Sequence, residues 1–154
     1  MKTVISLTFI LVVIFSGCDK SRVFDEYAAM PEENWNMDSI KYFPFQIEDS
    51  LAIYNMYINI RNTGKYEFSN LIVFVETDLP GQLKLRDTVN CILADEKGEW
   101  LGSGFGSIWT SKIPYKIKFR FPRNGQYDVH IQHGMRKEDL TGISDIGIRI
   151  EKAF

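Results

Sequence analysis

His130 and His133 are the two histidines of the chain, and they are the first candidates for metal binding. They lie in a run, 126–133, in which apolar and polar residues alternate as in a β-strand. Because successive strand residues point to opposite faces, two histidines three positions apart face away from each other. Neither has a cysteine or an ordered set of carboxylates close by in the sequence. The pattern therefore predicts neither a zinc site nor any other metal cofactor.

Acidic residues are the second candidates. Asp95, Glu96 and Glu99 gather around Gly98, but they lack the alternating oxygen ligands of a calcium loop. We interpret them as a solvated turn, with weak calcium binding as the alternative. A carboxylate pair for glycoside cleavage would have to come from distant strands, and no local pattern points to one. The sequence also has no nucleophile elbow, phosphate loop or cysteine–histidine signature. We predict that the protein is not an enzyme and needs no cofactor or small-molecule substrate.

The third reactive group is the thiol of Cys18. A positive start, an apolar run over 4–15 and small residues at 16–17 precede it, as in a secretory signal. The run is shorter than the roughly 20 apolar residues that span a bilayer. Small residues followed at once by cysteine resemble the lipobox of bacterial lipoproteins, with Phe15 where leucine is usual. This resemblance implies cleavage before Cys18 and acylation of Cys18, with palmitate as an expected chain. The alternative is an ordinary signal peptide that ends near a cysteine.

These features divide the chain into three parts. We predict a helical, cleaved signal peptide over 1–17, a lipidated N-terminus with a short tether over 18–34, and a folded domain over 35–154. From Cys18 onward the chain has 17 basic and 20 acidic residues, a net charge of −3 with neutral histidines. This balance, without a basic block, argues against nucleic-acid binding. Cys91 lies in an apolar run and is predicted to be a small buried residue, with a reactive thiol as the alternative.

The folded part consists of short runs in which apolar and polar residues alternate, separated by turn-forming pairs such as Asn124-Gly125. The predicted strands include 54–61, 71–75, 83–86, 113–121, 127–132 and 146–151. Many short strands without a helical period predict an all-β fold. We expect an antiparallel β-sandwich of jelly-roll or Ig-like type, with a barrel as the alternative.

Two of these runs allow a more specific prediction. A hairpin of 113–121 with 126–133 through a loop at 123–125 would place both apolar sides on one face, with paired residue numbers that sum to 248. Phe121 would then face Tyr127, and Arg120 would face Asp128.

Two segments are candidates for binding. The glycine-rich stretch 98–106 carries or adjoins Trp100, Phe105 and Trp109, and no helix follows that could receive a phosphate. These aromatic residues belong to the core, to a surface for a protein partner, or to a platform for sugars. The last possibility is our alternative function, a carbohydrate-binding surface lipoprotein.

The second segment is long for a strand connection and carries both charges. It consists of Met135, Arg136, Lys137, Glu138 and Asp139. Because surface loops on a rigid scaffold often carry contacts, we expect it to form part of a partner surface.

Several stretches together resemble the gliding-motility lipoprotein GldH family. They are CD at 18–19, RVFDEY at 22–27, YINIRN at 57–62, YEFSNL at 66–71, AD at 94–95, GEWLGSGFG at 98–106, MRK at 135–137 and GISDIGIRI at 142–150. Their order and spacing carry the resemblance across the chain from Cys18 to about Lys152.

The resemblance implies a lipoprotein of the outer membrane, on its periplasmic or its cell-surface face. It also implies a role in gliding motility and in the linked machinery that secretes surface proteins, whose components would be the partners. The family offers no enzymatic activity and no catalytic residues.

Overall fold

A computed structural model describes residues 19–153, whose regular secondary structure is almost entirely β-strand. The elements are β1 (Arg22–Ala29), the 3-10 turn η1 (Pro31–Glu33), β2 (Asn34–Asn36), β3 (Lys41–Ile47), β4 (Tyr54–Thr63), β5 (Asn70–Leu79), β6 (Leu83–Ile92), β7 (Ser103–Phe105), β8 (Ile108–Phe119), β9 (Gly125–His133), β10 (Asp139–Thr141) and β11 (Ile143–Lys152). The predicted signal peptide over 1–17 and Cys18 lie outside the described residues.

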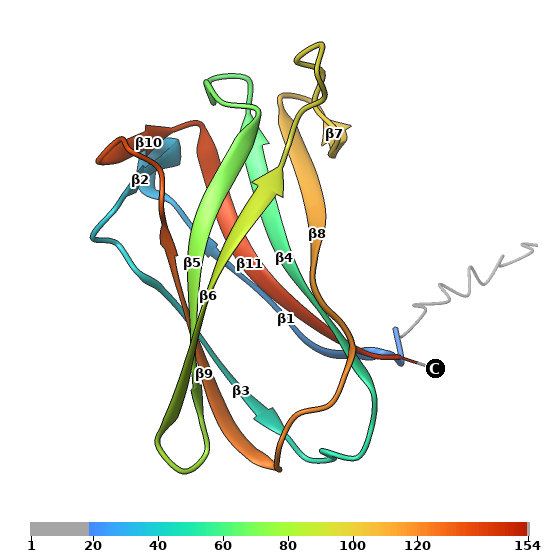
Figure 1. The fold of residues 1–154 in the computed structure, drawn as a ribbon. Coiled ribbons are helices and arrows are strands. Elements are labelled where there is room, and N and C mark those ends of the chain that lie inside the picture. The colour runs from blue at the N-terminus through green and yellow to red at the C-terminus, as the bar shows by residue number, and fades with distance from the viewer. Residues whose placement is uncertain (1–18, 154) are drawn as a thin grey trace, which may run out of the picture.

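The strands form two facing sheets and one small ribbon (Figure 1). One sheet has the order β1-β11-β4-β8-β7, the other has the order β3-β9-β5-β6, and β2 pairs with β10. Every strand pair is antiparallel. The predicted all-β sandwich is therefore confirmed.

The alternating pattern places the core between the sheets. Ile146, Ile148 and Ile150 of β11 are fully buried, as are alternate residues of β4 and β9. Residues two apart on a strand share a face, so one row of branched side chains fills the interior while most of the intervening residues face away from it. Trp35 of β2 closes the core at one end of the sandwich and is itself completely buried.

The predicted hairpin between 113–121 and 126–133 is wrong. β8 pairs with β4 and β7 in one sheet, whereas β9 pairs with β3 and β5 in the other. The prediction assumed that neighbouring strands pair, but the chain crosses between the sheets at residues 120–124. Register shifts in the β4–β8 pairing also break the alternation of β8, and Ile117 is exposed as a result.

Residues 22–36 belong to the folded body. Arg22–Ala29 forms the edge strand β1 against β11, although the sequence prediction placed it in a tether over 18–34, and Asn34–Asn36 forms β2, which begins one residue before the predicted domain over 35–154. The segment before β1 is therefore short. The described strands and core residues lie within 22–152, so a chain that begins at residue 19 retains the whole sandwich.

The sandwich has two ends with different loops (Figure 1). We call residues 19–22, 48–53, 80–82, 118–124 and 152–153 the terminal end, because both described chain ends lie there. We call residues 30–40, 64–69, 93–107 and 134–142 the distal end. The eight residues of β1 run between the ends, which gives a separation of about 26 Å.

Candidate functional site

The terminal end is tied together by Arg149 of β11, whose side chain is 16% exposed. Its guanidinium bonds the carboxylates of Asp25 and Glu151 and reaches Asp19, the first described residue. Lys112 also lies 2.7 Å from Glu151. Burial alone would lower the pKa of Arg149, but its bonds to the three acids outweigh this effect and raise it. The same bonds link β1 and the first described residues to β11.

Asp19 lies outside β1 but makes hydrogen bonds to the folded body. Its carboxylate accepts hydrogen bonds from Ser21, at 2.6 Å from the hydroxyl, and from Arg149, and these lower its pKa to about 2. Its carbonyl accepts the backbone N–H of Arg22. The position next to Cys18 is thus part of the folded body.

Basic side chains dominate the surface of this end. The terminal end has six basic and three acidic residues, a net charge of +3, whereas the distal end has four basic and nine acidic residues, a net charge of −5. The basic residues are Lys20, Arg22, Lys118, Arg120, Arg123 and Lys152, and all are exposed. No ion pair joins any of them to another described residue. The charge of the molecule is therefore strongly polarised along its long axis.

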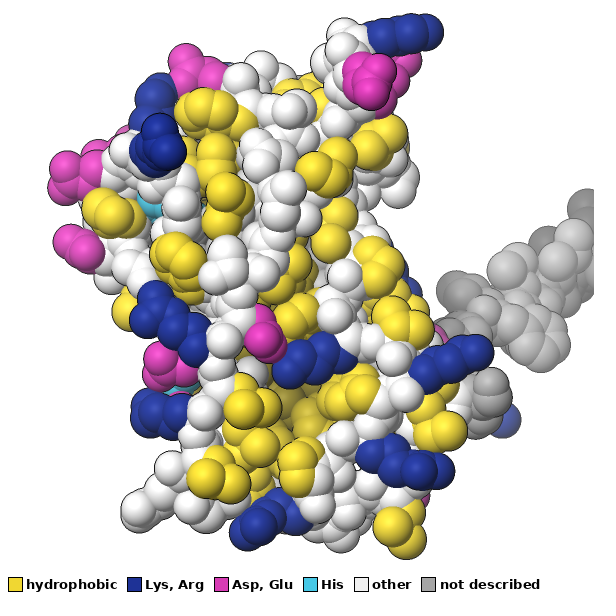
Figure 2. Space-filling view, viewed as in Figure 1, with side chains coloured by type: hydrophobic (Ala, Val, Ile, Leu, Met, Phe, Trp, Pro, Cys, Tyr) yellow, Lys and Arg dark blue, Asp and Glu magenta, His cyan; other side chains and the backbone are white. Residues whose placement is uncertain are grey.

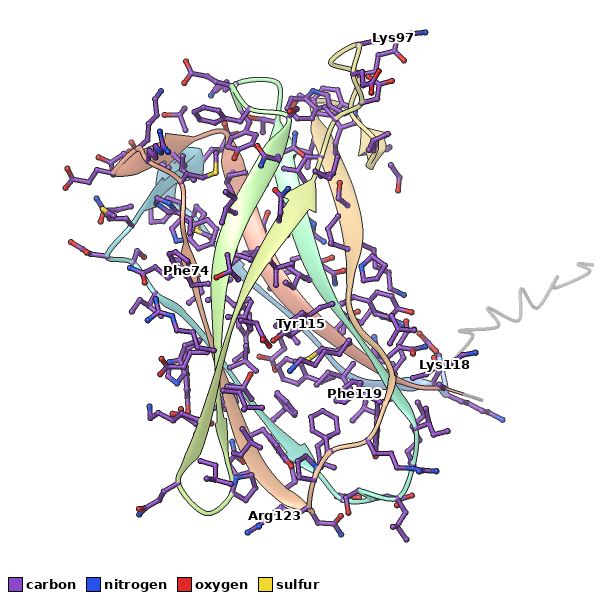
Figure 3. All side chains as sticks on the ribbon, in the orientation of Figure 1. Phe74, Lys97, Tyr115, Lys118, Phe119 and Arg123 are labelled. Carbon is purple, nitrogen blue, oxygen red and sulfur yellow. The ribbon has the colours of Figure 1, made fainter. Side chains whose placement is uncertain are left out.

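One side of the sandwich is open between β6 and β8. Leu83 and Leu85 point toward the interior, since they pair with buried Leu79 and Thr77, yet they are 57% and 48% exposed. A pocket of about 150 Å³ lies there, lined by apolar side chains that include Leu85 and Phe119. Figure 2 shows these apolar side chains around a hollow in the lower half of the face, and Figure 3 places Phe119 at its edge.

A polar contact closes the opening above that pocket. The Tyr115 hydroxyl donates to the Asp87 carboxylate, and the Lys116 ammonium lies 3.2 Å from it. These contacts lower the pKa of Asp87, and burial with the same bond raises the pKa of Tyr115. The sequence alternation of Leu83 and Leu85 predicted a strand but gave no indication that its inner face stays uncovered.

The aromatic residues of the glycine-rich segment divide into two groups. Trp100 and Trp109 are half-buried, with ring centroids 5.9 Å apart, and Trp100 packs against the core. Phe105, at the β7–β8 turn, is 94% exposed. Gly104 packs closely here, because a Cβ atom at this position would lie 3.0 Å from Nε1 of Trp109. The segment thus brings two rings into a packed cluster and presents one to solvent.

Phe105 borders a shallow pocket of about 430 Å³ that is also lined by Arg61, Thr110 and Asp145. Arg61 lies over the ring of Tyr27, 3.9 Å from its centroid. An exposed ring beside polar groups can anchor a protein partner or stack on a sugar.

The two end residues of the 135–139 segment bond to neighbouring strands, whereas the charged side chains between them are exposed. The Met135 sulfur accepts the N–H of Ile72, and the Asp139 carboxylate bonds Asn36 at 2.9 Å. Lys137 pairs with exposed Glu67, and the side chains of Arg136 and Glu138 are exposed. Three of the five predicted residues therefore offer charged groups at the distal end.

The other candidates take the positions expected from the sequence. His133 is buried against Trp35, while His130 lies on the outer face near Tyr42, so the two point to opposite faces as predicted. Cys91 is fully buried, and burial raises its pKa to about 12. Asp95 accepts the N–H groups of Lys97 and Glu99, which confirms a turn.

Residues 19–153 contain no cluster of three or more histidine, cysteine or acidic residues that could hold a metal ion. One surface pocket is lined by two neighbouring acids, Glu48 and Asp49, but the Asp49 carboxylate accepts the N–H groups of Leu51 and Ala52. Among the described helices, none is sufficiently long and apolar to cross a membrane.

Comparison with known proteins assigns the family. The family model described as GldH lipoprotein matches residues 22–150, which is nearly the whole sandwich. The chain belongs to the GldH lipoprotein family. The resemblance noted in the sequence is therefore confirmed, and membership of a lipoprotein family implies a protein anchored to a membrane.

Two relatives extend over nine-tenths of the chain. The Gliding motility lipoprotein GldH homolog of Christiangramia forsetii is 41% identical and covers 92% of this chain and 91% of its own length. The Gliding motility lipoprotein GldH of Flavobacterium johnsoniae is 37% identical, with 91% of each chain covered.

Among solved structures, one from infectious bursal disease virus covers 85% of this chain and 30% of its own, at 8% identity and a TM-score of 0.31. Nothing follows from a likeness at that level.

Proposed function

We propose that the protein is an outer-membrane lipoprotein, acylated at Cys18, that acts without catalysis in gliding motility and in the linked secretion of surface proteins. The observation that carries this proposal is the family match over 22–150, together with two gliding-motility relatives that align over nine-tenths of the chain. Two or more acyl chains hold a protein firmly on a membrane without a transmembrane helix.

The geometry supports a role close to the membrane. Because Asp19 is fixed to the body by Arg149 and Ser21, acyl chains on Cys18 would start about one residue, ~3.5 Å, from the folded domain. The terminal end would face the bilayer, and the distal end would face away from it. A component placed in this way can contact proteins in the same membrane from its sides and can meet other partners at its distal end.

The distal end supplies the candidate partner surface. Phe105 presents a large ring to solvent, and Arg136, Lys137 and Glu138 add charges of both signs. Aromatic and arginine side chains contribute most strongly to protein interfaces. We therefore assign the partner contact to the distal end.

Carbohydrate binding is the alternative, and the exposed ring of Phe105 beside Arg61 and Asp145 is the observation that favours it. A glycan array probed with the protein and with a Phe105→Ser variant separates the two. Binding to a defined glycan that the variant loses would support the alternative, and no glycan binding would support the protein-partner role.

The proposal is tested by deleting the gene and complementing it with the wild type, with Cys18→Ser and with Cys91→Ala as a matched cysteine control. We expect palmitate labelling, envelope association, colony spreading and adhesin secretion with the wild type and the control, and loss of all four with Cys18→Ser. Normal spreading and secretion in the deletion strain would contradict the motility role. A Cys18→Ser product that stays with the envelope, in cells whose wild-type protein takes up no palmitate, would contradict the anchor.

A further inference from the structure

We propose that the terminal end of the sandwich docks directly on anionic lipid headgroups, so that the membrane orients the body as well as tethering it. The orientation rests on the proposed acylation of Cys18. The docking surface itself depends on the charge, the exposure and the position of the residues at this end.

The charge of this end matches an anionic surface. Its six basic side chains are exposed, and none makes an ion pair within residues 19–153. Two of its three acids are engaged inside the protein, since Asp19 bonds Arg149 and Asp49 bonds the N–H groups of its own loop. Glu48 is the third acid. These bonds hold two of the acids against the body while the six basic side chains stay free of ion pairs, so the end keeps a net charge of +3 although the whole chain is acidic.

Apolar side chains lie among these basic groups. Leu51, in the β3–β4 loop, is 82% exposed, and Val23, Ile53 and Ile117 are also exposed. The guanidinium of Arg120 donates to the Leu51 carbonyl at 2.9 Å, which holds the loop in this position. Basic residues around exposed apolar residues are the composition of surfaces that bind the membrane interface, where cations meet phosphates and apolar groups enter the headgroup region.

The backbone of Lys118 has an unusual conformation. It adopts a left-handed backbone with φ of 51°, which is costly for any residue other than glycine, and its N–H donates to the Asn55 side chain at 2.8 Å. This backbone interrupts the alternation of β8 and leaves the lysine exposed at the terminal end. Figure 3 shows Lys118 and Arg123 extending from this end, on the opposite side of the molecule from Lys97.

The position of the anchor selects lipid over an acidic protein as the occupant. Asp19, the residue after Cys18, bonds Ser21 and Arg149 of the body, so only a short stretch of chain would separate an acylated Cys18 from this end. A protein partner would have to enter between the body and the membrane. Lipid headgroups are already there.

The test uses the unacylated chain from residue 19 to 154, which contains the whole sandwich, and vesicles of known composition. Vesicles of 30% phosphatidylglycerol in phosphatidylcholine are compared with pure phosphatidylcholine by flotation at 50 and 500 mM NaCl. We expect binding to the anionic vesicles at low salt, at least tenfold weaker binding to neutral vesicles, and loss at high salt because exposed charges are then screened. Equal binding to both vesicle types, or no binding to either, would overturn the proposal.

A variant pair locates the surface. Lys20→Gln, Lys118→Gln and Arg123→Gln together remove three terminal-end charges and leave Arg120, which holds the Leu51 loop. Each basic residue near a membrane changes affinity about fivefold, so we expect the triple variant to bind about 100-fold more weakly. The matched control, Lys65→Gln with Arg136→Gln and Lys137→Gln, removes the same charge from the distal end and should bind like the wild type.

Two outcomes would contradict the assignment: retention of binding by the terminal-end variant, or equal losses in both triple variants. If the terminal-end variant does not fold, Leu51→Ser serves instead, with an expected weakening of several-fold, and wild-type affinity from Leu51→Ser would count against docking. Acylation is read separately, by palmitate labelling of Cys18 in cells. A lack of vesicle binding would therefore contradict docking without contradicting the proposed function. A lack of palmitate labelling would contradict acylation whatever the vesicle result.

Discussion

The two ends of the sandwich are closed in similar ways but present opposite surfaces. At the distal end Trp35 fills the core beneath the β2–β10 ribbon, and at the terminal end Phe45, Phe121 and Tyr127 pack ring against ring. Yet one end carries a net charge of −5 and the other +3. Packing does not require this difference, which is the one expected if the terminal end faces an anionic bilayer and the distal end faces away from it.

The ends also differ in how their charges are held. At the terminal end Arg149 joins three acids in a partly buried cluster, whereas at the distal end Lys65–Glu33 and Lys137–Glu67 are exposed pairs. Exposed pairs contribute about 0–1 kcal/mol, but removing one partner of a buried pair costs several. We therefore expect the terminal end to be fixed by electrostatics and the distal end to be free to adapt.

The largest expected effect comes from Arg149→Met, which leaves Asp25 and Asp19 without their shared cation. We expect a loss of about 3 kcal/mol in the free energy of unfolding, measured by urea denaturation. Lys137→Gln is the control at the distal end and should cost less than about 1 kcal/mol. Equal losses of unfolding free energy in the two variants would contradict the claim that ion pairs stabilise the terminal end more than the distal end.

The Arg149 cluster should also make the stability of the protein depend on pH under acidic conditions. The pKa of Asp19 is lowered to about 2, so its contribution to stability is complete above pH ~4 and is lost as the pH falls toward 2. Arg149→Met should reduce this loss only in part, because the hydrogen bond from Ser21, which lowers the pKa of Asp19 most, remains.

A smaller effect is expected from His133, which belongs to the distal end of the core. Burial lowers the pKa of His133 below its usual value of about 6.5, so the unfolded chain binds a proton more readily than the folded one. Stability should therefore be constant above pH ~6.5 and decline as the pH falls from 6.5 toward 5. His133→Phe, followed by thermal unfolding over this range, should remove the decline, and an unchanged slope would assign it to other groups.

The smallest effect on stability is expected from Phe105→Ser. The ring is almost fully exposed, so we expect a change within about 0.5 kcal/mol. In cells, however, the variant should lower spreading if the distal end binds the partner. Trp109→Ser, which disrupts the packed ring cluster, is the comparison and should lose stability as well. Normal spreading with Phe105→Ser would remove Phe105 from the partner surface.

Much of the fold could be predicted from the sequence because three strands have an uninterrupted alternation. Residues 54–60, 127–131 and 146–150 show it, and their apolar sides are buried as expected. The prediction failed for the pairing of 113–121, where register shifts and the left-handed Lys118 break the alternation and the chain changes sheets. It also placed β1 in a tether, since RVFDEYAA has no regular alternation and forms an edge strand with little burial.

The candidate surfaces were harder to predict for a physical reason. Phe105, Trp109 and the 135–139 segment could be chosen from residue type and turn chemistry, but their exposure depends on packing against distant strands. The basic terminal end could not be recognised at all, because Lys20, Arg123 and Lys152 are far apart in the sequence and come together only through the strand order.

The most direct test of the polarised orientation measures both ends in one acylated protein. Single cysteines at Arg123 and at Lys97, which lie at opposite ends, are labelled with a fluorophore in proteoliposomes that contain a headgroup quencher; Cys91 is buried and is not expected to react. We predict strong quenching at position 123 and little at position 97. Equal quenching, or stronger quenching at position 97, would contradict the claim that the basic end rests on the membrane.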